Sequence, residues 1–228
     1  MTHPLCIIPA REHSRRIAQK NLRPLGGVSP LRRALQVCQI VMGAAEGQIV
    51  VTGDWFHSGT AGHTDGRDIC WHRAEAPLHT DTCSMVDVVL DVLQAYPAAE
   101  DQKVLLVQPT QPLRHAQHLR DALECLDDSS SLATVTETES LDKLYLLSPE
   151  ARLVPAGTGC ERHQDSRRTY RCDGTVYGFR RGWFLVHRSF RHPHDTLAVP
   201  LAAEETCALD TPTDWAIAES RLQNWTPC

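Results

Sequence analysis

The sequence predicts an α/β fold in which a mainly parallel sheet is flanked by helices. Short apolar runs of strand character alternate with longer segments whose apolar residues recur at helical spacing, which is typical of strand–helix–strand units. The first run, Leu5–Pro9, ends at a proline and leads into a long polar and basic loop. Because ligands bind beyond the carboxyl ends of parallel strands, this loop is the first candidate for a site.

The first half of the chain contains the clearest elements. Residues 30–43 carry apolar side chains at helical spacing, and residues 84–96 form a strongly amphipathic helical segment. The predicted strands of this half are short and apolar, and they cover residues 5–9, 48–52, 68–72 and 103–107. Residues 55–67 are rich in glycine, histidine, serine and threonine, so a loop is expected there.

The pattern continues with a helix over 115–127 and a strand over 131–136. A closing helix is expected over 212–223. Thr211 suits its N-cap position, because Pro212 fits the first turn and Asp214 lies three residues after the cap.

The region from 137 to 195 has a different character. Strand-like runs at 143–147 and 175–179 flank a polar loop over 149–170. We therefore expect a single domain over residues 1–228, in which 137–195 forms an arm or lid rather than part of the sheet core.

The composition excludes several classes of protein. A net charge of −5 argues against a general nucleic-acid binder, which usually carries a basic excess. No apolar run approaches 18 residues, so no transmembrane helix is expected, and the N-terminus has no secretory pattern. A cytoplasmic location is the default expectation.

The chain has nine cysteines and twelve histidines. The cysteines are scattered and form no C-x-x-C pair, so most are expected to be reduced core residues. His192 and His194 combined with Cys172 or Cys207 match no common zinc spacing, so a structural zinc site is not expected.

The loop after the first strand is the strongest functional signal. Basic side chains crowd the first 33 residues: Arg11, Arg15, Arg16, Lys20, Arg23, Arg32 and Arg33. Cations and backbone amides placed directly after a buried strand favour binding of a polyphosphate. The patterns G-x-x-x-x-G-K and G-x-G-x-x-G are both absent, so neither a Walker loop nor a dinucleotide-binding fold is expected.

The segment Ile7–Asn21, which reads IIPAREHSRRIAQKN, resembles the opening motif of cytidylyltransferases that activate acidic sugars. These include synthetases for CMP-sialic acid and, more distantly, CMP-Kdo. Ala10, Arg11, Ser14, Lys20 and Asn21 match that motif, and Arg15 replaces its usual lysine with the charge retained. The similarity continues through Gln108-Pro-Thr110, Asp173-Gly-Thr-Val-Tyr177 and Leu209-Asp210-Thr-Pro.

The resemblance implies a Rossmann-like sheet of the nucleotide-diphospho-sugar transferase type, with a small dimerisation arm and a homodimeric assembly. It implies that CTP and a small acidic acceptor are the substrates and that Mg²⁺ is the cofactor. Arg11, Lys20 and Asp210 are the implied catalytic residues, with Asp210 as the metal ligand. The implied nucleotide-binding residues are Ala10, Arg11, Ser14, Arg15, Lys20, Asn21, Arg73 and Ser84.

The implied acceptor-binding residues are Gln108, Thr110, Lys143, His163, Gln164, Tyr177, Phe190 and Arg191. Four departures from the family pattern matter. Ala208 stands where the sialic-acid branch has a first aspartate, His163 stands for an arginine and Asp173 for an asparagine. Phe190-Arg191 stands where that branch carries two aromatic residues, so an apolar wall is replaced by a cation.

These departures favour a compact, highly charged acceptor such as a phosphonate. One alternative is a sialic-type sugar-acid synthetase with a variant pocket. Another is a nucleotide-binding regulatory protein that has lost catalysis, which the Ala208 departure would favour. Use of UTP or GTP is disfavoured, because the glycine-rich L-A-A-G-x-G-x-R-M loop of such relatives is absent.

Overall fold

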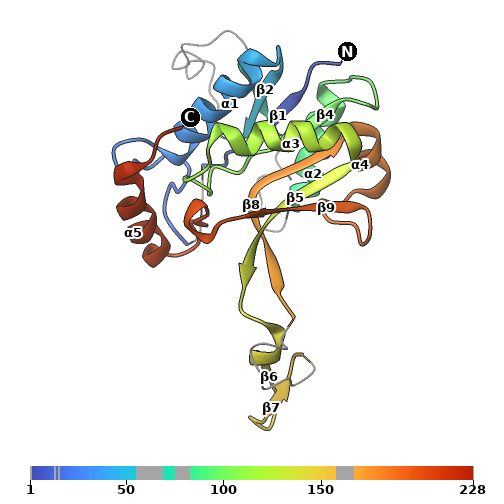
Figure 1. Ribbon diagram of the computed structural model, residues 1–228. Helices are drawn as coiled ribbons and strands as arrows, with labels where there is room; N and C mark the ends of the chain where they lie inside the picture. The colour runs from blue at the N-terminus through green and yellow to red at the C-terminus, as the bar shows by residue number, and fades with distance from the viewer. Residues whose placement is uncertain are drawn as a thin grey trace.

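The computed structural model describes residues 2–12, 14, 16–54, 69–74, 83–157 and 167–227. A seven-stranded sheet with the order β3-β2-β1-β4-β8-β5-β9 forms its centre (Figure 1). Its strands are β1 (Leu5–Pro9), β2 (Gln48–Gly53), β3 (Ile69–Arg73), β4 (Lys103–Leu106), β5 (Ser131–Thr138), β8 (Thr169–Arg180) and β9 (Thr196–Leu201). Strand β8 is antiparallel to both its neighbours and the other pairs are parallel, so the predicted mainly parallel sheet is confirmed.

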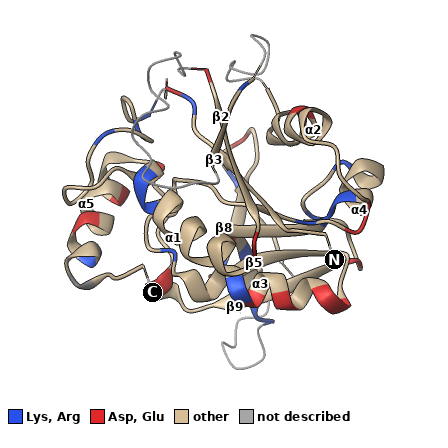
Figure 2. Ribbon diagram, turned by 90° about the horizontal axis from the view of Figure 1, so that it is seen from above, with Lys and Arg blue, Asp and Glu red and all other residues tan. Residues whose placement is uncertain are grey.

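Helices cover both faces of this sheet, as Figure 2 shows from above. Helices α1 (Pro30–Ala44) and α3 (Ala116–Asp128) pack on one face, and α2 (Met85–Ala95) and α4 (Arg181–His187) pack on the other. Successive side chains of β1 pack alternately into the two hydrophobic cores, because strand side chains alternate between faces. Both faces of the sheet are therefore buried around β1, β2 and β4, which explains why these strands are short and largely apolar.

The helix starts follow their capping residues. Ser29 accepts a hydrogen bond from Arg32 N at the start of α1. The closing helix α5 (Pro212–Arg221) begins at Thr211, whose side chain forms a capping box with Asp214, as expected from the sequence. A third core, formed by α5 and residues of the loop after β1, fixes this end of the chain beside the parallel strands.

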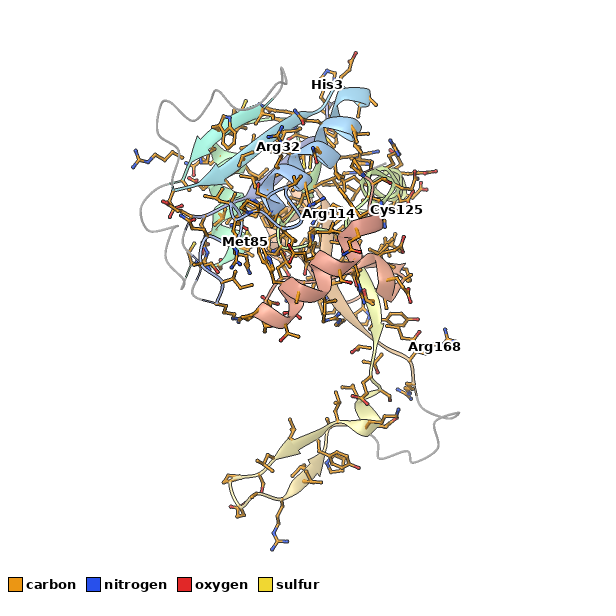
Figure 3. The ribbon with its side chains drawn as sticks, turned by 90° about the vertical axis from the view of Figure 1, so that its left-hand side faces the viewer. His3, Arg32, Met85, Arg114, Cys125 and Arg168 are labelled. Atoms are coloured by element: carbon orange, nitrogen blue, oxygen red, sulfur yellow. The ribbon has the colours of Figure 1, made fainter. Side chains whose placement is uncertain are left out.

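An arm projects from the sheet where β5 and β8 run on together beyond their neighbours (Figure 1). Its stem ends near the pair Thr138–Thr169, and its tip carries the antiparallel strands β6 (Tyr145–Leu147) and β7 (Leu153–Pro155). Arg168 lies at the arm's side of the body in Figure 3. The predicted polar loop over 149–170 was wrong in part, since it contains β7 and the start of β8.

The predicted extent of the arm, 137–195, also needs correction. The carboxyl half of β8 lies between β4 and β5 in the middle of the sheet. Helix α4 follows it and buries Phe184 completely, so residues 171–187 belong to the body. Neither α4 nor β9 was expected: α4 has seven residues, and β9 is an edge strand whose apolar side chains are largely exposed.

Other expectations have mixed outcomes. The predicted loop at 55–67 lies outside the described residues. The cysteines that are described are free. Cys6, Cys38 and Cys207 are buried as expected, whereas the other described cysteines are only half-buried. None of the helices in the described part of the chain has the length and apolar character needed to span a membrane.

Candidate active site

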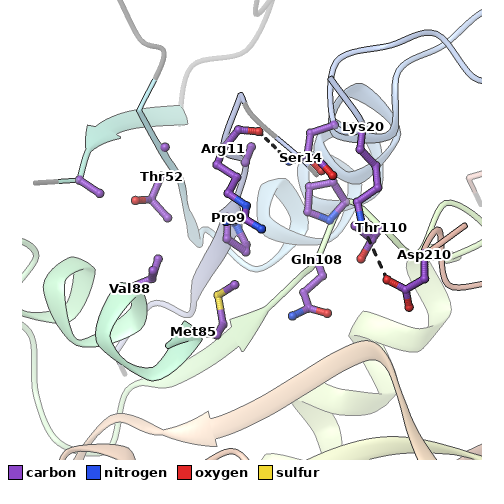
Figure 4. Close-up of a pocket in the computed structure, with 15 residues that line it drawn as sticks. Pro9, Arg11, Ser14, Lys20, Thr52, Met85, Val88, Gln108, Thr110 and Asp210 are labelled. Carbon is purple, nitrogen blue, oxygen red and sulfur yellow. Dashed lines mark hydrogen bonds and ion pairs between the residues drawn. The ribbon is translucent and has the colours of Figure 1, made fainter. Parts of the chain in front are cut away.

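A pocket of about 300 Å³ opens at the carboxyl ends of β1, β2 and β4 (Figure 4). Helix α1 leaves β1 toward one face of the sheet, and α2 precedes β4 on the other face. A crevice forms where such connections diverge, and this is where open α/β sheets bind ligands. The lining residues are Pro9, Ala10, Arg11, Ser14, Lys20, Asn21, Thr52, Gly53, Ala74, Met85, Val88, Gln108, Pro109, Thr110 and Asp210.

The loop after β1 is held in place by hydrogen bonds from the Asn21 side chain and to the end of β2. Asn21 Nδ2 donates to Arg11 O at 2.9 Å, which closes the loop upon itself. Ala10 N donates to Thr52 O at 2.8 Å and joins the loop to the end of β2. Two buried polar atoms of the lining, Asn21 Oδ1 and Thr52 Oγ1, have no hydrogen-bond partner among the residues that the structure describes. Buried polar atoms are normally satisfied, so both atoms indicate places where a bound ligand supplies hydrogen bonds.

Lys20 is the most enclosed cation of the pocket. Its side chain is 14% exposed, and Nζ donates to Leu209 O at 2.8 Å and lies 3.9 Å from Asp210 Oδ1. Burial lowers the pKa of Lys20, while the nearby Asp210 carboxylate opposes that shift. Arg16 Nη1 lies 3.1 Å from the same Asp210 oxygen, but its side chain is 69% exposed. Two cations therefore meet one carboxylate at the edge of the pocket, and Figure 4 shows one of them, Lys20, beside Asp210.

The turn after β4 is fixed by Arg114, whose supporting role the sequence analysis missed. Arg114 Nη2 donates to Gln108 O at 2.7 Å, and its Nε donates to Thr175 O at 2.6 Å. The side chain lies inside the body (Figure 3), and burial lowers its pKa to about 10. Arg114 thus ties the Gln108 turn to β8. A basic residue four positions after Thr110 was the available signal.

The C-terminal segment reaches the pocket through the same turn. Leu209 N donates to Thr110 O at 2.9 Å, which places Asp210 at the pocket rim. Asp210 N in turn donates to Asp214 Oδ2 at 3.2 Å. The capping box of α5 therefore also orients the segment that carries Asp210.

Asp210 is the one carboxylate among the described lining residues, so it is the candidate metal ligand. Ala208, two positions earlier, offers no side-chain oxygen. Mg²⁺ is commonly held by one or two carboxylates together with waters and substrate phosphates. The residues present fit such an ion, provided that a nucleotide completes its coordination.

The sequence analysis predicted that Asp173, which replaces an asparagine of the family pattern, changes the acceptor pocket. That prediction was wrong, because the Asp173 side chain does not face the pocket. Its carboxylate is buried, and it accepts hydrogen bonds from Thr134 Oγ1 at 2.7 Å and Thr136 Oγ1 at 2.9 Å. Thr175 N donates a third bond, also at 2.7 Å. The charge is used inside the body to join β5 to β8. Gly174, which follows, has a φ of +79°, a conformation that favours glycine.

Three predicted acceptor residues lie near one another. The Tyr177 and Phe190 ring centroids are 5.3 Å apart, and Arg191 is close enough to oppose the rise in Tyr177 pKa that burial causes. Gly174 precedes Tyr177 in β8 and packs closely against the Gln108 side chain. A Cβ added to Gly174 would lie only 2.9 Å from Gln108 Oε1, so the group and Gln108 are neighbours. Phe190 also packs against Phe184, so it is partly a core residue.

The remaining predicted residues lie elsewhere. Arg73 and Ser84 are exposed and stand next to the lining residues Ala74 and Met85 rather than in the lining itself. Ser84 caps α2 and donates to Asp87 Oδ2 at 2.7 Å. Lys143 lies on the arm. Arg15, His163 and Gln164 lie outside the described residues.

Several lining residues were missed by the sequence analysis: Gly53, Thr52, Ala74, Met85 and Val88. Thr52 and Gly53 end β2, the parallel neighbour of β1, so their position beside the loop follows from the strand order. The predicted strand at 48–52 was therefore a usable signal. Met85 and Val88 were assigned to the apolar face of a helix, and the sequence gives no sign that this face also reaches a pocket.

Comparison with known proteins supports the interpretation of this pocket as a nucleotide-binding active site. The family model described as cytidylyltransferase matches residues 5–155. The chain is 27% identical over 225 residues to a CMP-N,N'-diacetyllegionaminic acid synthase of Legionella pneumophila, covering 96% of both chains. It is 29% identical to an N-acylneuraminate cytidylyltransferase of Streptococcus agalactiae, covering 93% of this chain and 51% of that relative. The chain thus spans about half the length of the streptococcal protein.

Solved structures share the fold at lower sequence identity. One is CMP:2-keto-3-deoxy-manno-octonic acid synthetase complexed with CTP, with a TM-score of 0.70, 15% identity, and coverage of 97% of this chain and 99% of that one. Another is 4-diphosphocytidyl-2C-methyl-D-erythritol synthase from Anaerococcus prevotii, with a TM-score of 0.69, 14% identity, and coverage of 98% and 99%. Since the family model matches well over half of its length, the chain belongs to the cytidylyltransferase family and is a nucleotidyltransferase.

Proposed function

We propose that this chain transfers a cytidylyl group from CTP to a compact, strongly anionic acid such as a phosphonate and releases pyrophosphate. The observation that carries this choice of acceptor is Arg191 beside Tyr177 and Phe190, in a group that Gly174 links to Gln108. A cation at this place attracts a second negative charge on the acceptor, whereas a bulky acylated sugar would need an apolar wall there.

The reaction requires an acceptor oxygen to attack the α-phosphorus of CTP. A bond forms between that oxygen and the phosphorus, and the bond from the phosphorus to the bridging oxygen of pyrophosphate breaks. An ionised phosphonate oxygen carries no proton, so the attack needs no general base. The described lining contains no histidine or glutamate, and its one carboxylate, Asp210, is engaged by Arg16 and Lys20. This lining suits an acceptor that is already ionised.

The nucleotide is assigned to the loop after β1. Arg11 and Lys20 line the pocket and would neutralise the charge of the triphosphate, with Arg15 assigned beside them from the sequence. Ala10, Ser14 and Asn21 supply the surrounding backbone and polar atoms. Arg73 and Ser84 adjoin the lining at Ala74 and Met85, and we assign the cytosine edge to that side of the pocket.

We assign Mg²⁺ as the cofactor of this reaction, with Asp210 as its protein ligand. The ion would supply charge neutralisation for the phosphates in the transition state. Lys20 holds the carbonyl of Leu209 next to that carboxylate, so it positions Asp210 as well as binding phosphate. Gln108 and Thr110 border the same space and would orient the acceptor.

The relatives favour a second candidate acceptor, a sugar acid. The Legionella and streptococcal proteins are named for diacetyllegionaminic and acylneuraminic acids. Under this alternative, Arg191 would contact the carboxylate of the sugar acid. Residues outside the described lining of the nucleotide pocket would contact the rest of the sugar.

The two acceptors are separated by assaying CMP-product formation from CTP and Mg²⁺ with small phosphonates, Kdo and N-acetylneuraminate. The proposal expects turnover with at least one phosphonate, at a kcat/KM above that for either sugar acid. Turnover with N-acetylneuraminate alone would refute the phosphonate assignment. Absence of pyrophosphate release with every acceptor would instead favour a regulatory protein without catalysis.

We also propose a homodimer formed through the arm of a single-domain subunit. The arm tip exposes Leu146, Leu147 and Leu153 to at least 65%, together with Tyr145 and Val154. Contiguous exposed apolar side chains mark interaction surfaces, and a second copy offers the same arm. Lys143 lies on this arm, so in a dimer it would approach the partner's acceptor. Light scattering should give a dimer mass, and Leu146→Glu combined with Leu147→Glu should give a monomer.

A further inference from the structure

A group of side chains far from Asp210 in the fold has the arrangement of a metal site. In the described part of the chain, His187, His192 and Asp195 each offer a ligand atom, and these atoms all lie within 4.8 Å of one another. His187 is the last residue of α4, and the other two lie just before β9. The spacing belongs to no common zinc motif, and cysteines take no part, so the sequence analysis did not expect this site.

The distances suit a metal ion with bonds of ordinary length. A tetrahedral ion with bonds of about 2.1 Å holds its ligands about 3.4 Å apart. His192 Nδ1 and Asp195 Oδ2 are separated by 3.0 Å. Small rotations of the side chains would bring His187 to the same ion.

The ring nitrogen of His192 is poorly placed for a simple hydrogen bond. Nδ1 is buried and has no hydrogen-bond partner in the described part of the chain, although the Asp195 oxygen is so close. The carboxylate oxygen therefore lies off the direction in which the ring nitrogen points. A ligand pair bound to one ion has this geometry, because the ion lies along the nitrogen lone pair and the oxygen lies to one side of it.

Aromatic packing holds the two imidazole rings of the cluster close together. The rings of His187 and His192 have centroids 4.6 Å apart, and Trp183 packs on His187 at 4.7 Å. The packing thus presents two ring nitrogens, one from each histidine, beside the Asp195 carboxylate. Imidazole nitrogens with one carboxylate are a donor set for first-row transition ions rather than for Mg²⁺ or Ca²⁺.

The backbone holds the cluster before any ion binds. His192 O accepts bonds from Asp195 N at 3.3 Å and Thr196 N at 3.2 Å, which closes a tight turn. Thr196 Oγ1 accepts from His192 N at 2.8 Å and from Ser131 Oγ at 2.9 Å, which fixes the turn to β5. Beside the cluster, a second pocket of about 570 Å³ opens at the amino ends of β5 and β9. This edge is opposite to the one that carries the nucleotide pocket.

We propose that His187, His192 and Asp195 bind one divalent transition-metal ion, such as Zn²⁺, which joins the end of α4 to the turn before β9. Three protein ligands leave a position for water or for His194, which lines the second pocket. The ion fixes both ends of the loop 188–191, which carries Phe190 and Arg191. Binding itself does not depend on the cytidylyl-transfer proposal.

The test uses the full chain, stripped with a chelator, incubated with Zn²⁺ and dialysed, with bound metal counted by mass spectrometry. Wild type should retain one equivalent and show a higher melting temperature with Zn²⁺ than without it. His192→Ala and Asp195→Asn should lose both the equivalent and the temperature shift. Their metal-free melting temperatures should stay near that of metal-free wild type, which separates loss of the ion from loss of the fold.

Matched controls locate the ion. His3→Ala removes an exposed histidine that is not part of the cluster, Cys83→Ser removes a thiol outside it, and Asp210→Asn removes the candidate Mg²⁺ ligand. All three variants should retain the equivalent. Wild type that retains no Zn²⁺, or cluster variants that retain as much as wild type, would overturn the proposal. Asp195→Asn decides the matter if a histidine variant fails to fold, because Asp195 is exposed.

Discussion

The two halves of the candidate site are built in different ways. The nucleotide half, formed by the loop after β1 and Asp210, lies at the ends of parallel strands and is closed by local hydrogen bonds. The acceptor half, formed by Tyr177, Phe190 and Arg191, depends on a long antiparallel strand and a loop after α4. The first half can keep one chemistry while the second is changed, because few side chains are shared between them.

The largest expected effect comes from Lys20 in the nucleotide half. Lys20→Ala should lower kcat/KM for CTP about 1000-fold, since an enclosed cation directed at phosphate is lost. Arg16→Ala is the matched control, because Arg16 contacts the same Asp210 oxygen from an exposed position. It should cost about 5-fold or less. Steady-state kinetics with pyrophosphate detection measures both, and equal losses would mean that enclosure of Lys20 has no special role.

Asp173 tests the framework beneath the acceptor half. Asp173→Ala removes the shared acceptor of Thr134, Thr136 and Thr175 N. We expect the free energy of unfolding to fall by about 2–4 kcal/mol, because buried donors lose a charged partner. Urea unfolding followed by circular dichroism measures it. Glu137→Ala, an exposed carboxylate on the same strand β5, should change stability by less than about 0.5 kcal/mol. A similar small change for Asp173→Ala would contradict the proposed network.

The same contrast explains what the sequence could predict. Strand ends, the loop motif and the Thr211 cap follow from local patterns, so β1, β2, β4 and α5 were found nearly to the residue. The direction and central place of β8 depend on pairing with β4 and β5, which no local pattern reveals.

Side-chain direction was the other limit. Asp173 was read as a change in the acceptor pocket because its neighbours in sequence, Gly174 and Tyr177, resemble an acceptor block. The side chain instead points between strands, toward Thr134 and Thr136. Arg114 carries the same lesson, since this cation near the Gln108 turn points inward and supports the backbone of Gln108 and Thr175.

A smaller effect is expected from Arg191. Arg191→Phe restores an aromatic pair with Phe190 and removes the cation near Tyr177. Under the phosphonate proposal, kcat/KM for a phosphonate should fall about 10- to 100-fold, as for the loss of one specific contact, while the KM for CTP stays within about 2-fold. Arg168→Gln, an exposed arginine at the arm's side of the body, should change neither value. A matching loss for CTP would show that the two halves are not separable.

The smallest expected effect is a shift in pH dependence. Lys20 must be protonated to bind phosphate, so kcat/KM should fall as the pH rises through the pKa of Lys20 in the free enzyme. Burial lowers that pKa, which places the fall at a lower pH than an ordinary lysine would give. Bound triphosphate favours the charged form, so the corresponding fall in kcat should lie at higher pH.

Lys20→Arg decides whether this fall belongs to Lys20. A guanidinium stays protonated well above the range of a lysine, so the fall in kcat/KM should move to higher pH even if the variant is slower. An unmoved profile would assign the fall to another group. Because the acceptor-half variant Arg191→Phe leaves Lys20 untouched, its alkaline limb with CTP as the varied substrate should coincide with that of wild type. If the alkaline fall in kcat/KM for CTP were displaced in Arg191→Phe, the charge of Arg191 would interact with the phosphates. The acceptor half would then contribute to nucleotide binding.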